Sequence, residues 1–208
     1  MLTLAQTLPF LLAALLVTAS PGPDNLMVLS MGMSRGRAQG IAFGLGCALG
    51  CLSHTLLAVL GVSALIAASP LAFTALKWVG GAYLLWLGVQ ALRSRGGSHV
   101  SDEASPRQPL GTLCVKGMIA NAVNPKVVLF FLSFLPQFVV PSQGAVGWQL
   151  AQLGVLFTVQ AALLFGLLGY FAGSVGRWLH RQPRAGLWLD RLAGVVFVGL
   201  GLRLLMSR

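Results

Sequence analysis

Long apolar stretches separated by short polar connections fill almost the whole chain. A helix needs about 20 apolar residues to cross the hydrocarbon core of a bilayer. Six stretches meet this length, so the pattern predicts an all-α, polytopic integral membrane protein with six transmembrane helices. Their predicted ranges are 2–33, 40–68, 71–92, 111–140, 148–175 and 188–206.

Two of these stretches, the first and the fourth, are interrupted by residues that are rare inside a membrane helix. Proline removes a backbone donor and clashes with the preceding turn, so both helices should break there. Asp24 adds an ionisable group at membrane depth, which is costly and therefore indicates a function. The first interruption is Pro21-Gly22-Pro23-Asp24-Asn25, and the second contains Asn121, Asn124, Pro125 and Lys126.

The interruptions divide the predicted single transmembrane domain, residues 1–208, into two halves. Pro21 and Pro125 lie 104 residues apart, which is half the chain length of 208. Broken helices at matching places in two halves point to the binding site of a transporter. The predicted repeats are about 1–92 and about 111–208, and a hydrophilic loop at about 93–110 joins them.

Glycines support the same division. Three helices per half is an odd number, so the second copy must be inverted in the membrane. Chance matching of Gly and Leu in so apolar a chain is the alternative explanation. The matches share an offset of 113 residues and relate Gly81 to Gly194 and Gly88 to Gly201.

The charge distribution fits a membrane protein. Only 9% of the residues are charged and 56% are hydrophobic, whereas a soluble domain carries roughly 25% charged residues. The net charge is +10, but the basic residues lie between apolar stretches. We interpret them as topology signals and lipid-headgroup contacts and expect no nucleic-acid partner.

The positive-inside rule predicts the orientation. The connections after the first, third and fifth stretches hold ten basic residues, against three on the other side. Those connections are therefore predicted to be cytoplasmic and both termini periplasmic. Met1 to Phe10 contains no Lys or Arg that could form the basic region of a signal peptide, and Pro9 interrupts the apolar run, so we expect a retained first helix. The ten residues are Arg35, Arg37, Arg93, Arg95, Arg107, Lys116, Arg177, Arg181, Arg184 and Arg191.

The interruptions offer groups for both charges of an amino acid. Each restarting half-helix has unpaired amide groups at the positive end of its dipole, and these together with Lys126 suit a carboxylate. Asp24, freed carbonyls and three asparagine amides suit an ammonium. If the breaks meet, Asp24 and Lys126 could pair, which would lower the cost of burying either charge. Alternatively, Asp24 is a cap in a wet connection and Lys126 snorkels. The asparagines are Asn25, Asn121 and Asn124.

His54 is a second candidate, beside Asp24, for coupling transport to protons. It lies at membrane depth, and imidazole titrates near neutral pH; the alternative is a hydrogen-bonded packing histidine. The three cysteines have no CxxC spacing and no clustered histidines, so we expect small packing residues and no metal site. These cysteines are Cys47, Cys51 and Cys114.

Several motifs run through essentially the whole chain in a characteristic order. They are Ser20-Pro21-Gly22-Pro23-Asp24-Asn25, Ser34-Arg35-Gly36, Gly40 with Gly46 and Gly50, Gly80-Gly81-Ala82-Tyr83-Leu84-Leu85-Trp86-Leu87-Gly88, Asn124-Pro125-Lys126 and Phe134-Leu135-Pro136-Gln137-Phe138. Together they resemble the LysE/RhtB family of amino-acid exporters. The resemblance implies export of amino acids or close derivatives across the bacterial inner membrane, driven by the proton gradient and without a cofactor.

One departure bears on the substrate. The branch of the family that exports lysine and arginine carries an Asp where this chain has His54 and another where it has Phe130. A cationic side chain needs such a counter-charge in a low-dielectric cavity. The resemblance therefore implies a neutral substrate such as threonine, homoserine, homoserine lactone or a leucine-like amino acid.

Other functions have weaker support. A membrane thiol–disulfide electron carrier needs two cysteines that can meet, and Cys47 and Cys51 are constrained one turn apart on one helix. A metal-ion exporter needs clustered ligands, and the chain has only four acidic residues. An enzyme is not expected, because HExxH is absent and the apolar stretches hold no paired carboxylates. Expected partners are the amino-acid substrate and the bilayer; glycine-rich faces would allow a homodimer but equally serve internal packing.

Overall fold

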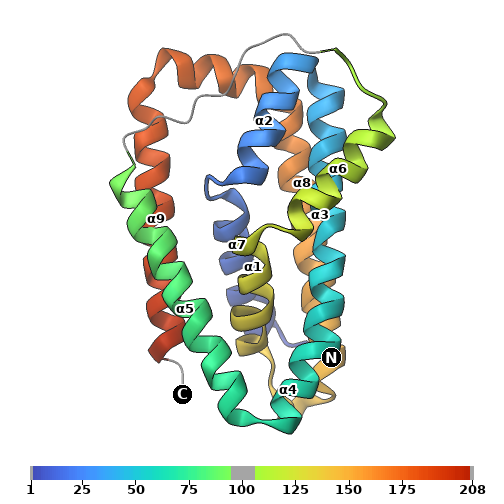
Figure 1. The fold of residues 1–208 in the computed structure, drawn as a ribbon, viewed down its shortest axis with the longest axis vertical. Helices are drawn as coiled ribbons and strands as arrows, with labels where there is room; N and C mark the ends of the chain where they lie inside the picture. Colours follow the sequence, from blue (N-terminus) through green and yellow to red (C-terminus); the bar gives the residue numbers. More distant parts are fainter. Residues whose placement is uncertain (1, 95–105, 207–208) are drawn as a thin grey trace.

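The computed structural model describes residues 2–94 and 106–206 (Figure 1). These residues form helices and no strand, so the predicted all-α class is confirmed. Arg95 and most of the predicted loop lie outside the described residues. The helices are α1 (Leu4–Ala19), α2 (Pro23–Arg35), α3 (Arg37–Leu57), α4 (Ser63–Ala68), α5 (Pro70–Arg93), α6 (Leu110–Ala122), α7 (Pro125–Leu129), α8 (Val146–Arg181) and α9 (Pro183–Met206).

Short non-α segments extend two of these helices. A π-helical segment, Ala58–Val62, joins α3 to α4, and another, Phe130–Phe134, follows α7. Two 3₁₀ turns, Leu135–Phe138 and Pro141–Gln143, then lead to α8. The chain therefore remains helical from Pro125 to Phe138, although α7 itself is short.

Both predicted breaks are present. α1 meets α2 at an angle of 57°, and α6 meets the segment Pro125–Phe138 at 55°. Three helices, α3 with its extension, α5 and α8, are long and apolar enough to cross a membrane, and counting each bent pair as one span gives five in the described part of the chain. α9, which carries four charged residues, is not among the five, although it packs along α5 (Figure 1).

Some predicted boundaries and loop positions are wrong. α8 continues to Arg181 and α9 begins at Pro183, so Gln182 alone separates them. Arg177 and Arg191 consequently lie within helices, not in a connection, and Lys116 lies within α6. The apolar pattern places each helix end where the apolar stretch ends, but Arg and Lys are good helix formers and do not stop a helix.

The two ends of the molecule match the predicted topology. α1 begins and α9 ends at the end where α4 turns into α5, whereas the α2–α3 and α8–α9 junctions lie at the opposite end (Figure 1). We call these the terminal end and the junction end. The assignment of the junction end to the cytoplasm stays a prediction.

Glycines let α5 and α9 approach closely. A Cβ atom placed on Gly88 would lie 2.9 Å from the Gly194 carbonyl oxygen, and one on Gly194 would lie 2.9 Å from that of Gly88. Gly81 and Gly201 show the same reciprocity, at 3.4 and 3.0 Å. In the predicted repeat, Gly81 corresponds to Gly194 and Gly88 corresponds to Gly201. The contacts instead pair Gly88 with Gly194 and Gly81 with Gly201, which is the crossed arrangement that a two-fold axis produces. This contact supports the predicted inverted repeat.

Aromatic side chains fill the interior toward the terminal end. We call them the phenylalanine cluster: Phe10, Phe130, Phe131, Phe134, Phe138 and Phe157, all at most 6% exposed. Neighbouring ring centroids in the cluster lie 4.9 to 6.5 Å apart. The cluster joins α1, the segment after α7, and α8, and it leaves the interior on this side of the breaks closely packed.

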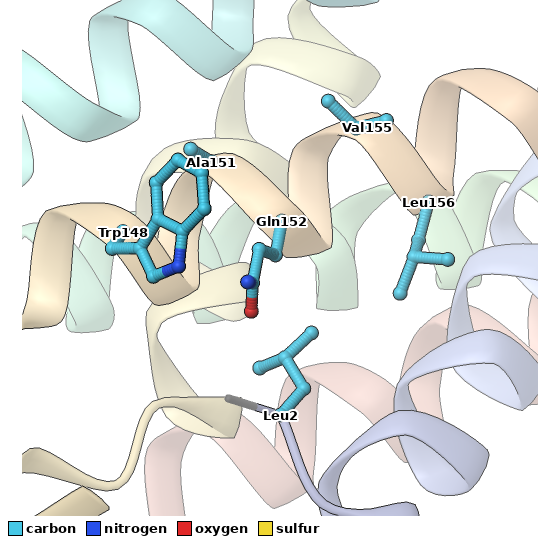
Figure 2. A pocket seen from close by; sticks show the side chains of 6 residues that line it. All are labelled: Leu2, Trp148, Ala151, Gln152, Val155 and Leu156. Carbon is cyan, nitrogen blue, oxygen red and sulfur yellow. The ribbon is translucent and has the colours of Figure 1, made fainter. Parts of the chain in front are cut away.

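A shallow cleft of about 440 Å³ also lies near the terminal end, between Leu2, which precedes α1, and α8. Figure 2 shows Leu2 facing the α8 side chains Trp148, Gln152 and Leu156. Its lining is apolar apart from Gln152, so it offers little to a charged ligand. The functional site must be sought at the breaks.

Candidate functional site

The two breaks meet inside the protein. The side chains of Asp24, Asn121 and Lys126 are 2%, 1% and 6% exposed. Asn121, at the end of α6, donates a hydrogen bond from Nδ2 to Asp24 Oδ2 over 2.7 Å, which joins α6 directly to the first turn of α2. The structure therefore brings the two predicted halves of the site together, and Asp24 is no cap in a wet connection.

Lys126 reaches across from the second break to the first. Its Nζ donates to the carbonyl oxygens of Val17 and Ser20, each over 3.2 Å. These carbonyls lie in the last turn of α1 and at its C-cap, where backbone acceptors lack helical partners and the dipole is negative. The ammonium also lies against Gly22, where a Cβ atom would come within 2.9 Å of Nζ. Lys126 thus caps α1 from inside the protein, and the snorkelling interpretation is wrong.

Asp24 and Lys126 bind different partners. The carboxylate accepts from Asn121, the ammonium donates to carbonyls, and the residues described here include no ion pair between the two. The direct pair that we considered is therefore not present in this structure. The two opposite charges nevertheless interact electrostatically within one buried region, so each lowers the cost of burying the other.

The remaining asparagines hold the ends of the half-helices. Asn124 Oδ1 accepts from the backbone amide of Lys126 over 3.1 Å and so caps α7. Asn25 Nδ2 donates to the Thr18 carbonyl over 2.9 Å and bridges the first break. The polar residues of both breaks are thus fixed by hydrogen bonds between segments that the prolines separate.

Some buried polar atoms at the breaks have no hydrogen-bond partner among the described residues. Buried polar groups are almost always paired in proteins, so a cluster of unpaired donors and acceptors marks a place suited to a polar ligand. The unpaired atoms at the breaks include both kinds of group, an amide donor and amide acceptors. Its atoms are Asn25 Oδ1, Asn124 Nδ2, His54 Nδ1 and Gln160 Oε1.

His54 belongs to the same network. It is 1% exposed, and its Nε2 lies 3.1 Å from the Asn121 carbonyl oxygen. Cys51, one turn earlier on α3, donates from Sγ to Asn121 Oδ1 over 3.5 Å. Asn121 therefore links Asp24 on α2 to His54 on α3. Both interpretations of His54, a proton carrier and a hydrogen-bonded packing residue, fit this position.

The sequence did not indicate two site residues, Gln160 and Thr18. Gln160 of α8 donates from Nε2 to Thr18 Oγ1 over 2.7 Å, which adds a sixth helix to the network around the breaks. The available signal was an amide in the middle of a long apolar stretch. Cys47 and Cys51 are free thiols, and the described part of the chain holds no group of three His, Cys, Asp or Glu residues arranged for a metal ion.

A cleft of about 570 Å³ opens beside the first break, between α2, the last turns of α5 and the part of α9 from Asp190 to Phe197. Pro21, Gly22 and Pro23 form part of its wall. Gly22 therefore lies between the cleft and the buried ammonium of Lys126. The cleft begins near the junction end, on the opposite side of the breaks from the phenylalanine cluster.

The fold and the site define a class: a polytopic membrane protein whose two broken helices bring unlike charges together in its interior, as in secondary transporters. The chain belongs to the LysE type translocator family, whose family model matches residues 15–208. The family resemblance of the motifs is thereby confirmed. No solved structure matches the chain.

Several curated proteins are similar over almost their full length. An uncharacterized membrane protein of Vibrio cholerae serotype O1 is 33% identical over 203 residues, covering 97% of each chain. The homoserine/homoserine lactone efflux protein of Salmonella typhimurium is 30% identical, covering 96% of this chain and 95% of its own. The leucine efflux protein of an Enterobacter species is 29% identical, covering 94% and 92%.

Proposed function

We propose that the protein exports a neutral amino acid, or a close derivative such as homoserine lactone, from the bacterial cytoplasm across the inner membrane in exchange for protons. The observation that carries this proposal is the burial of Asp24, Asn121 and Lys126 where the two half-helices meet. Relatives named as leucine and homoserine efflux proteins add support for this substrate class.

The site has groups for both ends of a zwitterion. Lys126 and the amide ends of α2 and α7 suit the carboxylate, whereas Asp24 and the Asn25 Oδ1 acceptor suit the ammonium. In the present structure Lys126 donates to the α1 carbonyls. The carboxylate of a bound substrate would accept hydrogen bonds from Lys126 in place of the carbonyls, so substrate binding would loosen the first break. That coupling is what alternating access requires.

The surroundings of His54 and Phe130 favour a neutral side chain. The rings of His54 and Phe131 lie 5.6 Å apart, and those of Phe131 and Phe130 lie 6.2 Å apart. The two positions that carry Asp in the lysine-exporting branch are thus close together here and belong to an aromatic region. Such a region stabilises an apolar side chain and offers no counter-charge to a cationic one.

Proton coupling would use the network that Asn121 organises. Asp24 and His54 are the two titratable groups joined through Asn121. Protons entering from the periplasm through these groups would exchange for the substrate, and the gradient would supply the driving force without a cofactor. In this arrangement the termini face the periplasm and the junction end faces the cytoplasm, as the positive-inside rule predicts.

The test is efflux from reconstituted liposomes loaded with labelled L-leucine, L-threonine, L-homoserine or L-lysine, with and without an imposed proton gradient. We expect the neutral substrates to leave and L-lysine to stay, with faster efflux under the gradient. Protein-free liposomes loaded in the same way serve as the control for leakage. Preferential L-lysine efflux would overturn the substrate class, and rates unaffected by the gradient would overturn proton coupling.

A further inference from the structure

The cleft between α2, α5 and α9 carries an acidic group that the proposed site does not use. Ser94, directly after α5, donates from Oγ to Asp190 Oδ2 of α9 over 2.5 Å. This short, charge-assisted hydrogen bond fixes the carboxylate at the edge of the cleft. Asp190 is only partly buried, so the carboxylate remains accessible from the cleft.

The cleft wall changes from polar to apolar toward the protein interior. Leu87, Ala91 and Phe197 line it beyond Asp190, and Gly22 lines it at the first break. Behind that wall lies Lys126, whose Nζ is 5.8 Å from the centroid of the Phe197 ring. A carboxylate, an apolar surface and a cation therefore follow one another from the cleft into the interior.

This sequence of groups matches the chemistry of a neutral amino acid. A carboxylate recognises the ammonium group, an apolar wall accepts the side chain, and a cation at the inner end attracts the substrate carboxylate. The volume of about 570 Å³ falls within the range of small-molecule pockets. The phenylalanine cluster closes the interior on the other side of the breaks, so the cleft is the more open approach to Lys126.

We propose that this cleft is a loading site, in which Asp190 holds the ammonium group of the substrate before it moves past Gly22 and Phe197 to Lys126. The substrate class rests on the proposed export of neutral amino acids. Because the cleft lies near the junction end, the loading site takes substrate from the predicted cytoplasmic side. The Ser94 hydroxyl orients the Asp190 carboxylate for this binding.

The first test replaces the charge and keeps the hydrogen bond. In Asp190→Asn the amide oxygen still accepts from Ser94, so the contact between α5 and α9 survives. We expect the half-saturating concentration of L-leucine for export to rise roughly tenfold or more, with little change in the maximal rate, since a hydrogen bond to a charged group is lost. Asp190→Glu should recover much of the affinity.

A matched control changes a neighbouring charge outside the cleft. Arg191 is exposed and lies over the Trp188 ring, and it does not line the cleft. Arg191→Gln should therefore leave the half-saturating concentration unchanged. If Asp190→Asn exports L-leucine with the affinity of the parent protein, the carboxylate binds no substrate and the loading site is overturned.

The second test blocks the cleft without changing a charge. Ala91→Cys, made in a variant without the three native cysteines, is treated with a membrane-impermeant thiol reagent from the cytoplasmic side. We expect modification to stop export and L-leucine to slow the modification, whereas succinate, which has no ammonium group, should not protect. Modification that leaves export intact, or that occurs only from the periplasmic side, would contradict the proposal.

The outcomes separate this proposal from the proposed function. If the parent protein exports none of the tested amino acids, the proposed function fails. If export proceeds but neither Asp190→Asn nor the blocked cleft affects it, the loading site alone fails and the interior site at the breaks stands.

Discussion

α1 bends into α2 by 57° and α6 bends into the segment starting with α7 by 55°, and each second half-helix begins with proline. The residue after that proline is Asp24 in the first break and Lys126 in the second. The backbones of the two breaks are therefore alike, while their charges are opposite. Two like charges at these positions would repel each other in a low-dielectric interior.

The partners of the two breaks differ as well. The carbonyl end of α1 is capped by Lys126, which comes from the other break. The carbonyl end of α6 is approached by His54 of α3, and its Asn121 side chain reaches Asp24. Each break is thus completed by a residue from elsewhere in the chain. The repeated scaffold supplies the position of the site, and the unlike residues supply its polarity, which suits a zwitterion.

The largest effect is expected from removing the negative charge. Asp24→Asn keeps an oxygen that can accept from Asn121, so the protein should insert and remain folded. Export of L-leucine or L-homoserine from proteoliposomes should fall to the leakage rate, because the substrate ammonium loses its counter-charge. Equal elution of both proteins in detergent controls for folding, and normal efflux from the variant would show that the site lies elsewhere.

Removing the positive charge should reduce both stability and export. Lys126→Ala leaves the Val17 and Ser20 carbonyls without their donor, and each buried unpaired acceptor costs about 1–3 kcal/mol. Thermal unfolding in detergent should therefore shift to lower temperature, and efflux should fall strongly. Lys116→Ala is the matched control, because Lys116 is exposed and bonded to Gln108; an equal loss of stability there would contradict the capping role.

Exchanging the two charges tests whether the breaks are interchangeable. Because Asp24 and Lys126 bind different partners, the double variant Asp24→Lys with Lys126→Asp should not restore export. The ammonium at position 24 would face the amide donor of Asn121, and the carboxylate at position 126 would face carbonyl oxygens. Restored transport would show instead that the two charges pair directly during the transport cycle.

The sequence was sufficient to predict the two breaks and the residues around them. Proline and ionisable residues inside apolar stretches act locally, so their effect on a helix can be deduced without the fold. The meeting of the breaks could be argued from matching positions in two halves. The partners of Lys126 could not be predicted from the sequence, because they are backbone carbonyls, which every residue possesses.

The contributions of residues on distant helices could not be predicted from the sequence either. Gln160 and Asp190 lie on α8 and α9, and only the packing of these helices brings them near the breaks and the cleft. The helix ends were misplaced because the hydrophobic pattern reports where lipid contact stops, and a helix continues past that point while residues with good helix propensity follow. Polar contacts between helices depend on packing that no local pattern encodes.

A smaller effect should follow from changing His54, which distinguishes the second break from the first. His54→Gln can still donate to the Asn121 carbonyl but cannot carry a proton. We expect the variant to export substrate down its concentration gradient while losing the acceleration by a proton gradient. His54→Leu, which loses the hydrogen bond as well, should also be less stable. A full response of His54→Gln to the gradient would leave His54 as a packing residue and Asp24 as the coupling candidate.

The smallest effect is expected from the thiol that contacts Asn121. Cys51 Sγ donates to Asn121 Oδ1 over 3.5 Å, and sulfur is a weak donor, so its loss should disturb the second break little. A variant with Cys47→Ala, Cys51→Ser and Cys114→Ala should therefore export L-leucine at close to the parent rate, measured in the same liposomes. A cysteine-free protein that still exports excludes thiol–disulfide exchange as its activity. If this variant loses export completely, and Cys51→Ser alone has the same effect, the thiol is part of the mechanism. The charged residues of the two breaks would then have a structural role around it.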